Sequence, residues 1–132
     1  MRKAIFIFLF AFVAAVGFAR DKKNDKNEKA LPVYIWGASI SFSDTIAYFT
    51  EIQELDNVVL VNDLLPHRQY YAYQLKDYMN FEENMPGRIS VIYFEKKRHK
   101  LEQKEAKIRK RLIEKDNMTV RYLGDRFKFV KP

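Results

Sequence analysis

The clearest pattern along the chain is a series of short apolar runs with alternating polar positions, followed by two segments of helical character. Residues 33–42 alternate with the period of a β-strand, and Gly37 within them marks a bulge or a close backbone approach. The turn signal at residues 43–45 leads into residues 46–55, which alternate in the same way, so the two runs predict an antiparallel hairpin. Residues 58–61 are short and apolar, and they predict an edge strand.

The second half of the chain predicts two helices with a strand between them. Residues 69–84 repeat apolar side chains at helical spacing and end at a Pro-Gly stop. Residues 88–95 are rich in β-branched and aromatic residues, so we expect a buried central strand there. Residues 96–115 contain no Gly or Pro and consist mostly of strong helix formers, so they predict a helix. Residues 118–123 predict the last main strand, and a short terminal strand is expected from residue 127 onward.

In chain order these elements read β-β-(β)-α-β-α-β, which indicates an α+β fold. We expect a mainly antiparallel sheet of four to five strands, with two helices packed on one face as a two-layer sandwich. The chain has 132 residues, which suits a single domain with a core of its own. We assign that domain to residues 33–132.

The N-terminal residues predict an export signal that is separate from this domain. Two basic residues precede an uncharged apolar run at residues 4–18, and residues 17–19 have the small-x-small form of a cleavage site. We therefore expect a signal peptide at residues 1–19, cleaved near Ala19, with an uncleaved anchor as the alternative. Residues 20–32 predict a disordered linker.

The cysteine content narrows both the chemistry and the location. The chain has no cysteine, which excludes disulfides, a thiol nucleophile and a thiolate metal site. Because a bacterial lipid anchor is attached to a cysteine, the absence of cysteine also removes the acceptor for such an anchor. We therefore expect a bacterial protein that is periplasmic or secreted and that is not an integral membrane protein after cleavage.

The positive charge of the chain is concentrated in one segment. Residues 96–115 hold ten Lys and Arg against three Glu, a net +7, whereas residues 33–95 hold nine acids against three bases, a net −6. Within the predicted helix, Leu101, Ile108 and Leu112 form a narrow apolar seam. A row of cations runs beside this seam at positions Lys100, Lys104, Lys107 and Arg111.

Like charges at these spacings repel by about 0.2–0.5 kcal/mol per pair, so an opposite charge should compensate the row. We interpret the row as a contact surface for an anionic partner, which would be an acidic protein, an anionic glycan or a lipid headgroup. A solvated helix face and coiled-coil association through the seam are the alternatives. Nucleic acid is disfavoured, because base stacking requires aromatic side chains interleaved with the cations.

A second kind of site would use the aromatic residues. An aromatic groove around Trp36 and Tyr71 would suit a glycan or a peptide, and the protein would then be a small ligand-binding module. Aromatic residues at strand or helix spacing also suit packing in a core, which is the alternative reading of these two positions.

A hydrolase is the remaining alternative. Asp63 and His67 lie four residues apart, and Ser39 or Ser41 could complete a triad with them. The chain contains no recognised catalytic, cofactor-binding or metal-binding motif. We therefore expect a non-enzymatic interaction or accessory protein, with the basic helix as its contact surface.

Three stretches of the sequence carry a resemblance to known proteins. They are WGASISFSD at residues 36–44, YAYQL at residues 71–75 and SVIYFEKKR at residues 90–98. Together they resemble small uncharacterised exported proteins of anaerobic gut bacteria. The resemblance covers most of the chain after the predicted signal peptide. It implies an exported location and a small size, and it implies no activity and no functional residues.

Overall fold

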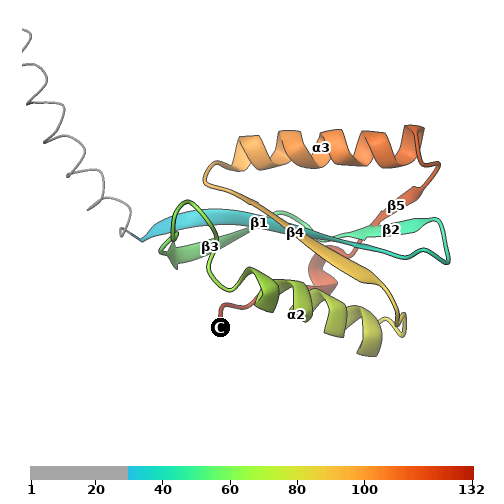
Figure 1. Ribbon diagram of the computed structural model, residues 1–132, viewed down its shortest axis with the longest axis horizontal. Helices are drawn as coiled ribbons and strands as arrows, with labels where there is room; N and C mark the ends of the chain where they lie inside the picture. Colours follow the sequence, from blue (N-terminus) through green and yellow to red (C-terminus); the bar gives the residue numbers. More distant parts are fainter. Residues whose placement is uncertain (1–29) are drawn as a thin grey trace, which may run out of the picture.

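A computed structural model describes residues 30–132, which form one mixed five-stranded sheet with a helix on each side (Figure 1). The elements in chain order are β1 (Leu31–Ile40), β2 (Ile46–Phe49), β3 (Gln53–Val58), α2 (Arg68–Phe81), β4 (Ile89–Glu95), α3 (Arg98–Glu114), β5 (Thr119–Tyr122) and the 3-10 helix η1 (Gly124–Arg126). The predicted α+β class is confirmed. The predicted signal peptide and most of the predicted linker lie outside the described residues.

Strand β1 is the centre of the sheet because it pairs along both of its edges. On one edge β4 is antiparallel to it, from Tyr34 opposite Glu95 to Ile40 opposite Ile89. On the other edge β2 and β3 follow one another, also antiparallel, and β5 pairs in parallel with β2. The prediction of a central strand at residues 88–95 is therefore wrong, since β4 pairs with β1 alone in the described part of the chain. Its apolar composition reflects the helices packed on its two faces.

The second predicted strand is interrupted at Thr50, where a side chain replaces a backbone partner. Gly37 donates its N–H to Thr50 Oγ1 at 2.9 Å, and its carbonyl accepts from the Thr50 N–H at 2.9 Å. The Thr50 hydroxyl donates to the Glu51 carbonyl at 3.0 Å. The chain therefore leaves the ladder after β2 and rejoins it as β3, so residues 46–55 contain two strands. A Cβ on Gly37 would lie 2.9 Å from Leu75 Cδ2, so a larger residue here would require the Leu75 side chain to shift.

Both faces of β1 are apolar, and a different helix covers each of them. On one face Val33 and Ile35 pack with α2. On the other face Trp36 and Ala38 pack with Leu101 of α3. Figure 1 shows α3 above the sheet and α2 below it. The prediction of two helices on one face is wrong, because a strand that is apolar at both sets of alternating positions needs a cover on each side.

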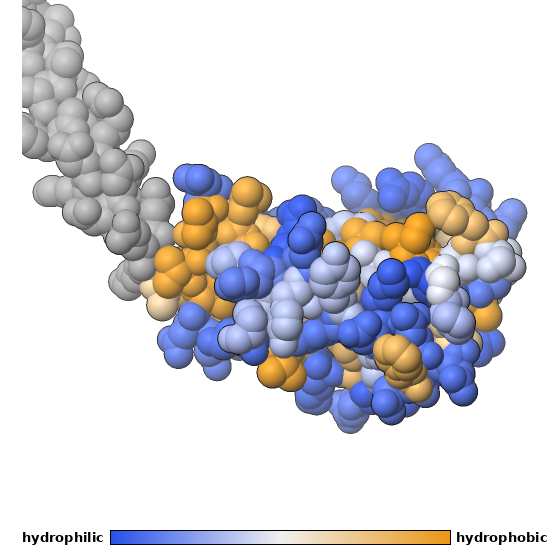
Figure 2. Space-filling view, turned by 60° about the horizontal axis from the view of Figure 1, so that its bottom comes forward, coloured by the Kyte–Doolittle hydropathy of each residue, from blue (hydrophilic) through white to orange (hydrophobic). Residues whose placement is uncertain are grey.

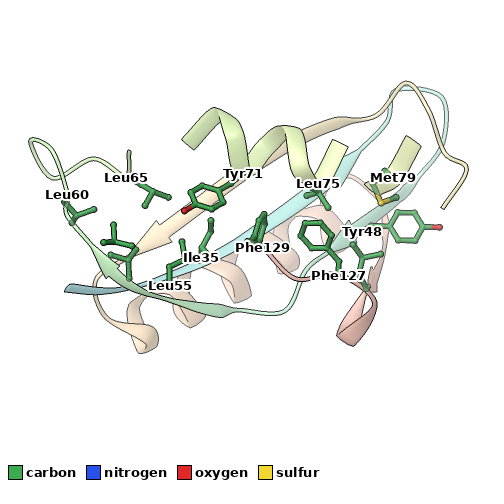
Figure 3. Packing of buried hydrophobic residues seen from close by; sticks show 13 residues of the cluster. Ile35, Tyr48, Leu55, Leu60, Leu65, Tyr71, Leu75, Met79, Phe127 and Phe129 are labelled. Carbon is green, nitrogen blue, oxygen red and sulfur yellow. The ribbon is translucent and has the colours of Figure 1, made fainter. Parts of the chain in front are cut away.

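The larger core lies between the sheet and α2, and the C-terminal segment completes it (Figure 3). Tyr71, Leu75 and Met79 extend from α2 toward the sheet, at the spacing that the sequence predicts for the apolar side of this helix. Phe127 and Phe129 fill the space beside them, with their ring centroids 4.8 Å apart. Phe127 and Phe129 of the C-terminal segment are therefore part of the core.

Two glutamine side chains bind the backbone of the C-terminal segment. They take the place of the backbone partners that a neighbouring strand would provide. Gln53 Oε1 accepts from the Phe129 N–H at 2.7 Å. Gln74 Oε1 accepts from the Val130 N–H at 3.0 Å, and Gln74 Nε2 donates to the Val130 carbonyl at 2.6 Å. Because side chains satisfy this backbone, the terminal strand predicted from residue 127 onward does not form.

The remaining differences are shifts at the ends of elements. β1 begins at Leu31, which lies opposite Val58, so the last two residues of the predicted linker belong to the sheet. The edge strand predicted at residues 58–61 does not form, because Val58 ends β3 and Val61 makes only an isolated bridge to Leu64. The two predicted helices and the last main strand lie close to their expected positions. None of the described helices is long and apolar enough to cross a membrane.

Candidate functional site

Helix α3 presents the concentrated positive charge as one continuous rod. Leu101 is buried against the sheet, and Ile108 and Leu112 are partly buried beside it, which confirms the predicted apolar seam. Nearly all other side chains of α3 are exposed. Because no Gly or Pro interrupts the helix, its cations keep helical spacing from one end to the other.

The predicted row of cations runs along one side of α3 and meets the end of β4 at Lys104. We call the four residues of this row the basic flank: Lys100, Lys104, Lys107 and Arg111. Lys104 Nζ lies 2.7 Å from Glu95 Oε2 at the end of β4, which fixes the position of the flank. The other three cations have no acidic group within 4.0 Å among residues 30–132. Within the described residues, an acidic side chain therefore neutralises only one of the four cations.

The opposite side of α3 is compensated within the protein. Buried Glu105 accepts from Arg109 Nη1 at 2.5 Å and from the Tyr122 hydroxyl at 2.8 Å. Burial and the hydrogen bond to Glu105 raise the pKa of Tyr122. The hydrogen bond to Tyr122 raises the pKa of Arg109. Arg98 pairs with Glu102 at 3.3 Å one turn along the same side. Arg98 and Arg109 on this side thus both have acidic partners, whereas on the basic flank only Lys104 has one.

The basic flank borders two shallow depressions of the surface. The first has a volume of about 480 Å³ and is lined by Glu95, Lys100, Gln103, Lys104 and Lys107. The second has a volume of about 420 Å³ and is lined by Lys107, Ile108, Lys110, Arg111, Glu114 and Lys115. Small-molecule sites are usually enclosed and largely apolar. These open, cationic depressions therefore suit an extended anionic partner better than a small molecule.

The aromatic groove predicted around Trp36 and Tyr71 is contradicted by the burial of both residues. Trp36 is fully buried beneath α3, with its ring centroid 4.6 Å from that of Phe49 and 4.7 Å from that of Tyr93. Tyr71 is buried on the opposite face of the sheet, where burial raises its pKa. Figure 2 brings the α2 side forward and shows no deep hollow on that view of the described residues. The two residues belong to separate cores and cannot line one groove.

The residues considered as a hydrolytic triad are not hydrogen-bonded to one another. Ser39 Oγ accepts from Arg88 Nε at 3.0 Å, and Ser41 shares a hydrogen bond with a nearby serine. Asp63 forms an exposed ion pair with the lysine that follows β4. His67 lies at the start of α2 and has no side-chain hydrogen bond within the described residues. No carboxylate–His–hydroxyl chain links these four, and the described residues hold no cluster of acidic and histidine side chains suited to a metal ion.

Two residues that shape the charge pattern around α3 are not among the predicted site residues. Glu95 enters the prediction only through the net negative charge of residues 33–95, although its place directly before the basic helix is a signal that could identify it. Tyr122 is the other, and it meets Glu105 from β5, a strand that lies far along the chain. That contact depends on the packing of α3 over β5, so no local spacing predicts it.

The function has to be inferred from α3 and its surroundings, and the resemblance to exported bacterial proteins stays a prediction. No family model, no curated protein and no solved structure matches the chain.

Proposed function

We propose that the protein is a non-enzymatic binding module that contacts an anionic partner through the basic flank of α3, and that it acts outside the cytoplasm. One observation carries the proposal. Lys104 has an acidic partner, whereas Lys100, Lys107 and Arg111 have none within the described residues. Like charges at helical spacing destabilise a helix, and an anion bound across them would relieve that repulsion. The predicted signal peptide supports the location.

The arrangement of charges favours a contact surface over a solvated helix face. Arg98 and Arg109 on the other side of the same helix pair with acids one turn away. The unpaired cations of the basic flank instead share one side of the helix and border two depressions of the surface. Such a single-signed surface attracts and orients an oppositely charged partner. Coiled-coil association is disfavoured, because Leu101 and the rest of the seam already pack on the sheet.

The test compares two triple variants that remove the same charge from different surfaces. The first changes the unpaired flank cations: Lys100→Gln, Lys107→Gln and Arg111→Gln. The control removes exposed cations from α2 and the C-terminal segment: Arg68→Gln, Lys76→Gln and Lys128→Gln. The dissociation constant for poly-L-glutamate is measured for each protein over a series of NaCl concentrations.

We expect the flank variant to bind poly-L-glutamate about ten-fold more weakly than the control variant at physiological salt. Three exposed ion pairs at about 0.2–1 kcal/mol each account for a loss of this size. The affinity of the flank variant should also depend less steeply on salt, because fewer counterions are displaced. Equal affinities and equal salt dependence for the two variants would show that the flank is only solvated surface.

A further inference from the structure

Part of the β4 backbone has no hydrogen-bond partner among the described residues. The hydrogen bonds of β1, the central strand, show which N–H and carbonyl groups of β4 point outward. Gly37 of β1 directs both its N–H and its carbonyl toward Thr50 on the β2–β3 side. In an extended strand, successive residues direct these groups to opposite sides. Trp36 and Ala38 therefore direct theirs toward β4. The β4 residues opposite them, Tyr93 and Val91, are the ones that bond to β1.

The outward backbone groups of β4 consequently belong to Ser90, Ile92 and Phe94. No loop, turn or side chain among residues 30–132 bonds to these groups. The strand carries one charged residue and no proline, and it pairs with β1 without a bulge. Native edge strands usually carry charges, prolines or bulges that prevent further pairing. An edge with a single charged residue, no proline and no bulge is suited to receive another strand.

The free edge lies beside the basic flank. Ile89 and Val91 point to the α3 face of the sheet and remain 42% and 37% exposed. They stay uncovered because α3 starts over the end of β4 and then crosses the sheet toward β5 (Figure 1). The ion pair between Lys104 and Glu95 ties the flank to this same face of β4. A strand added to the edge would bring every second side chain up toward the flank.

We propose that the free edge of β4 and the basic flank form one docking groove for an extended acidic segment of a partner protein. This inference rests on the proposed function and adds the chemistry and conformation of the partner. Backbone hydrogen bonds to Ser90, Ile92 and Phe94 hold the segment in register. Acidic side chains on the α3 face meet the unpaired cations of the flank, which selects an acidic sequence.

Charge disfavours the other occupants of this groove. Antiparallel pairing of two copies through β4 would place two basic flanks on the same face, where they repel. Residues 20–30 of the chain hold five basic and three acidic side chains, so their net charge has the wrong sign. A lipid headgroup supplies negative charge but no backbone groups to pair with β4. An acidic strand satisfies both parts of the groove.

The probe is a capped peptide in which Glu and Val alternate over seven residues, the length of β4. Its dissociation constant is measured for wild type, for the flank variant and for Ser90→Pro, which removes an outward N–H. Ser90→Ala is the reference for Ser90→Pro, since it also removes the hydroxyl but keeps the N–H. Amide hydrogen exchange of wild type with and without peptide gives a second readout that depends on no variant.

We expect Ser90→Pro to bind the peptide about ten-fold more weakly than Ser90→Ala, as the loss of one backbone hydrogen bond implies. Saturating peptide should slow amide exchange at Ser90, Ile92 and Phe94. Equal binding by the two Ser90 variants together with unchanged exchange would overturn the groove, while flank-dependent binding of poly-L-glutamate would leave the proposed function intact. Should Ser90→Pro not fold, the exchange data decide alone.

Two further measurements distinguish the other possible occupants of the groove, a lipid surface and a second copy of the protein. Binding to phosphatidylglycerol vesicles without binding to the peptide would overturn the groove in favour of a lipid surface. Sedimentation of wild type without peptide reports on a second copy as the occupant. A dimer that Ser90→Pro dissolves would also overturn the inference, whereas a monomer that binds the peptide supports it.

Discussion

At the scale of single residues, polar side chains take the place of backbone partners at several points of this fold. Thr50 receives the Gly37 N–H, and Gln53 receives the Phe129 N–H. Each of these bonds satisfies a backbone group that the sequence pattern would assign to a strand partner. Tyr78 shows a related use of a side chain, because its hydroxyl donates to Glu83 at 2.5 Å between α2 and the C-terminal part of the core.

The Tyr78 hydroxyl predicts a loss of stability at alkaline pH. Burial, and after it the hydrogen bond to Glu83, raise the pKa of Tyr78 from 10.0 to about 12. The unfolded chain therefore releases this proton first, and the contribution is fully present below about pH 10 and lost as pH rises toward 12. We expect the free energy of unfolding, measured by urea denaturation, to fall less steeply over this range in Tyr78→Phe than in wild type.

Tyr73→Phe is the matched control, because Tyr73 lies on the same helix, is 59% exposed and has no hydrogen-bond partner for its hydroxyl within the described residues. Its alkaline slope should equal that of wild type. The slope of Tyr78→Phe should be reduced but not abolished, since burial also raises the pKa of Tyr71 and of Tyr122. Identical slopes for both variants and wild type would contradict the role assigned to Tyr78.

At the scale of elements, one buried arginine joins the start of β4 to the first hairpin. Arg88 donates to Ser39 Oγ at 3.0 Å, to the Ser39 carbonyl at 3.2 Å and to the Ile46 carbonyl at 2.5 Å. It also pairs with Asp44 in the turn at 2.8 Å and lies over the Tyr48 ring. The groups that Arg88 binds come from β1, β2 and the turn between them, so it fixes the beginning of the edge strand against the hairpin.

Replacing Arg88 should therefore be costly. Arg88→Met leaves buried carbonyl and hydroxyl groups without a donor, and we expect the free energy of unfolding to drop by about 3 kcal/mol. Lys96→Met is the control, because its ion pair with Asp63 is exposed on both sides and should be worth less than about 1 kcal/mol. Urea denaturation of both variants measures the difference. A loss of similar size in the two would mean that Arg88 is not the link between these elements.

The elements themselves were largely predictable, whereas their arrangement in space was not. Alternation over residues 33–42 predicts β1, and the helical spacing of Tyr71, Leu75 and Met79 predicts the buried side of α2. The same alternation gives no sign of which helix covers which face. The role of Thr50 in dividing the second strand depends on a side-chain bond to Gly37 across the hairpin. Such contacts follow from tertiary packing and leave no periodic signal.

Prediction of the site shows the same limit. The basic flank follows from helical spacing, so its four residues could be named from the sequence alone. Which of them are neutralised depends on how α3 packs on the sheet, because the partner of Lys104 reaches it from the end of β4. Trp36 and Tyr71 illustrate the opposite case, since their aromatic character suits a groove or a core equally well and only burial distinguishes the two.

At the scale of the whole molecule, the sheet separates two surfaces of different character. The α3 side carries the net positive segment, and Lys104 joins its basic flank to the end of β4. Figure 2 brings forward the α2 side, where hydrophilic surface is interrupted by separate apolar areas. An anionic partner is therefore expected to approach from the α3 side, guided by the field of the basic flank.

A residue-resolved titration is the most direct test of whether an anionic partner binds at the basic flank. Poly-L-glutamate is added to isotope-labelled protein, and the amide chemical shifts are followed. We predict that the largest changes occur at Lys100, Lys107 and Arg111 and along β4, with only small changes at Arg68 and Lys76 on α2. Changes centred on α2, or spread evenly over all exposed lysines, would contradict a contact surface at the basic flank.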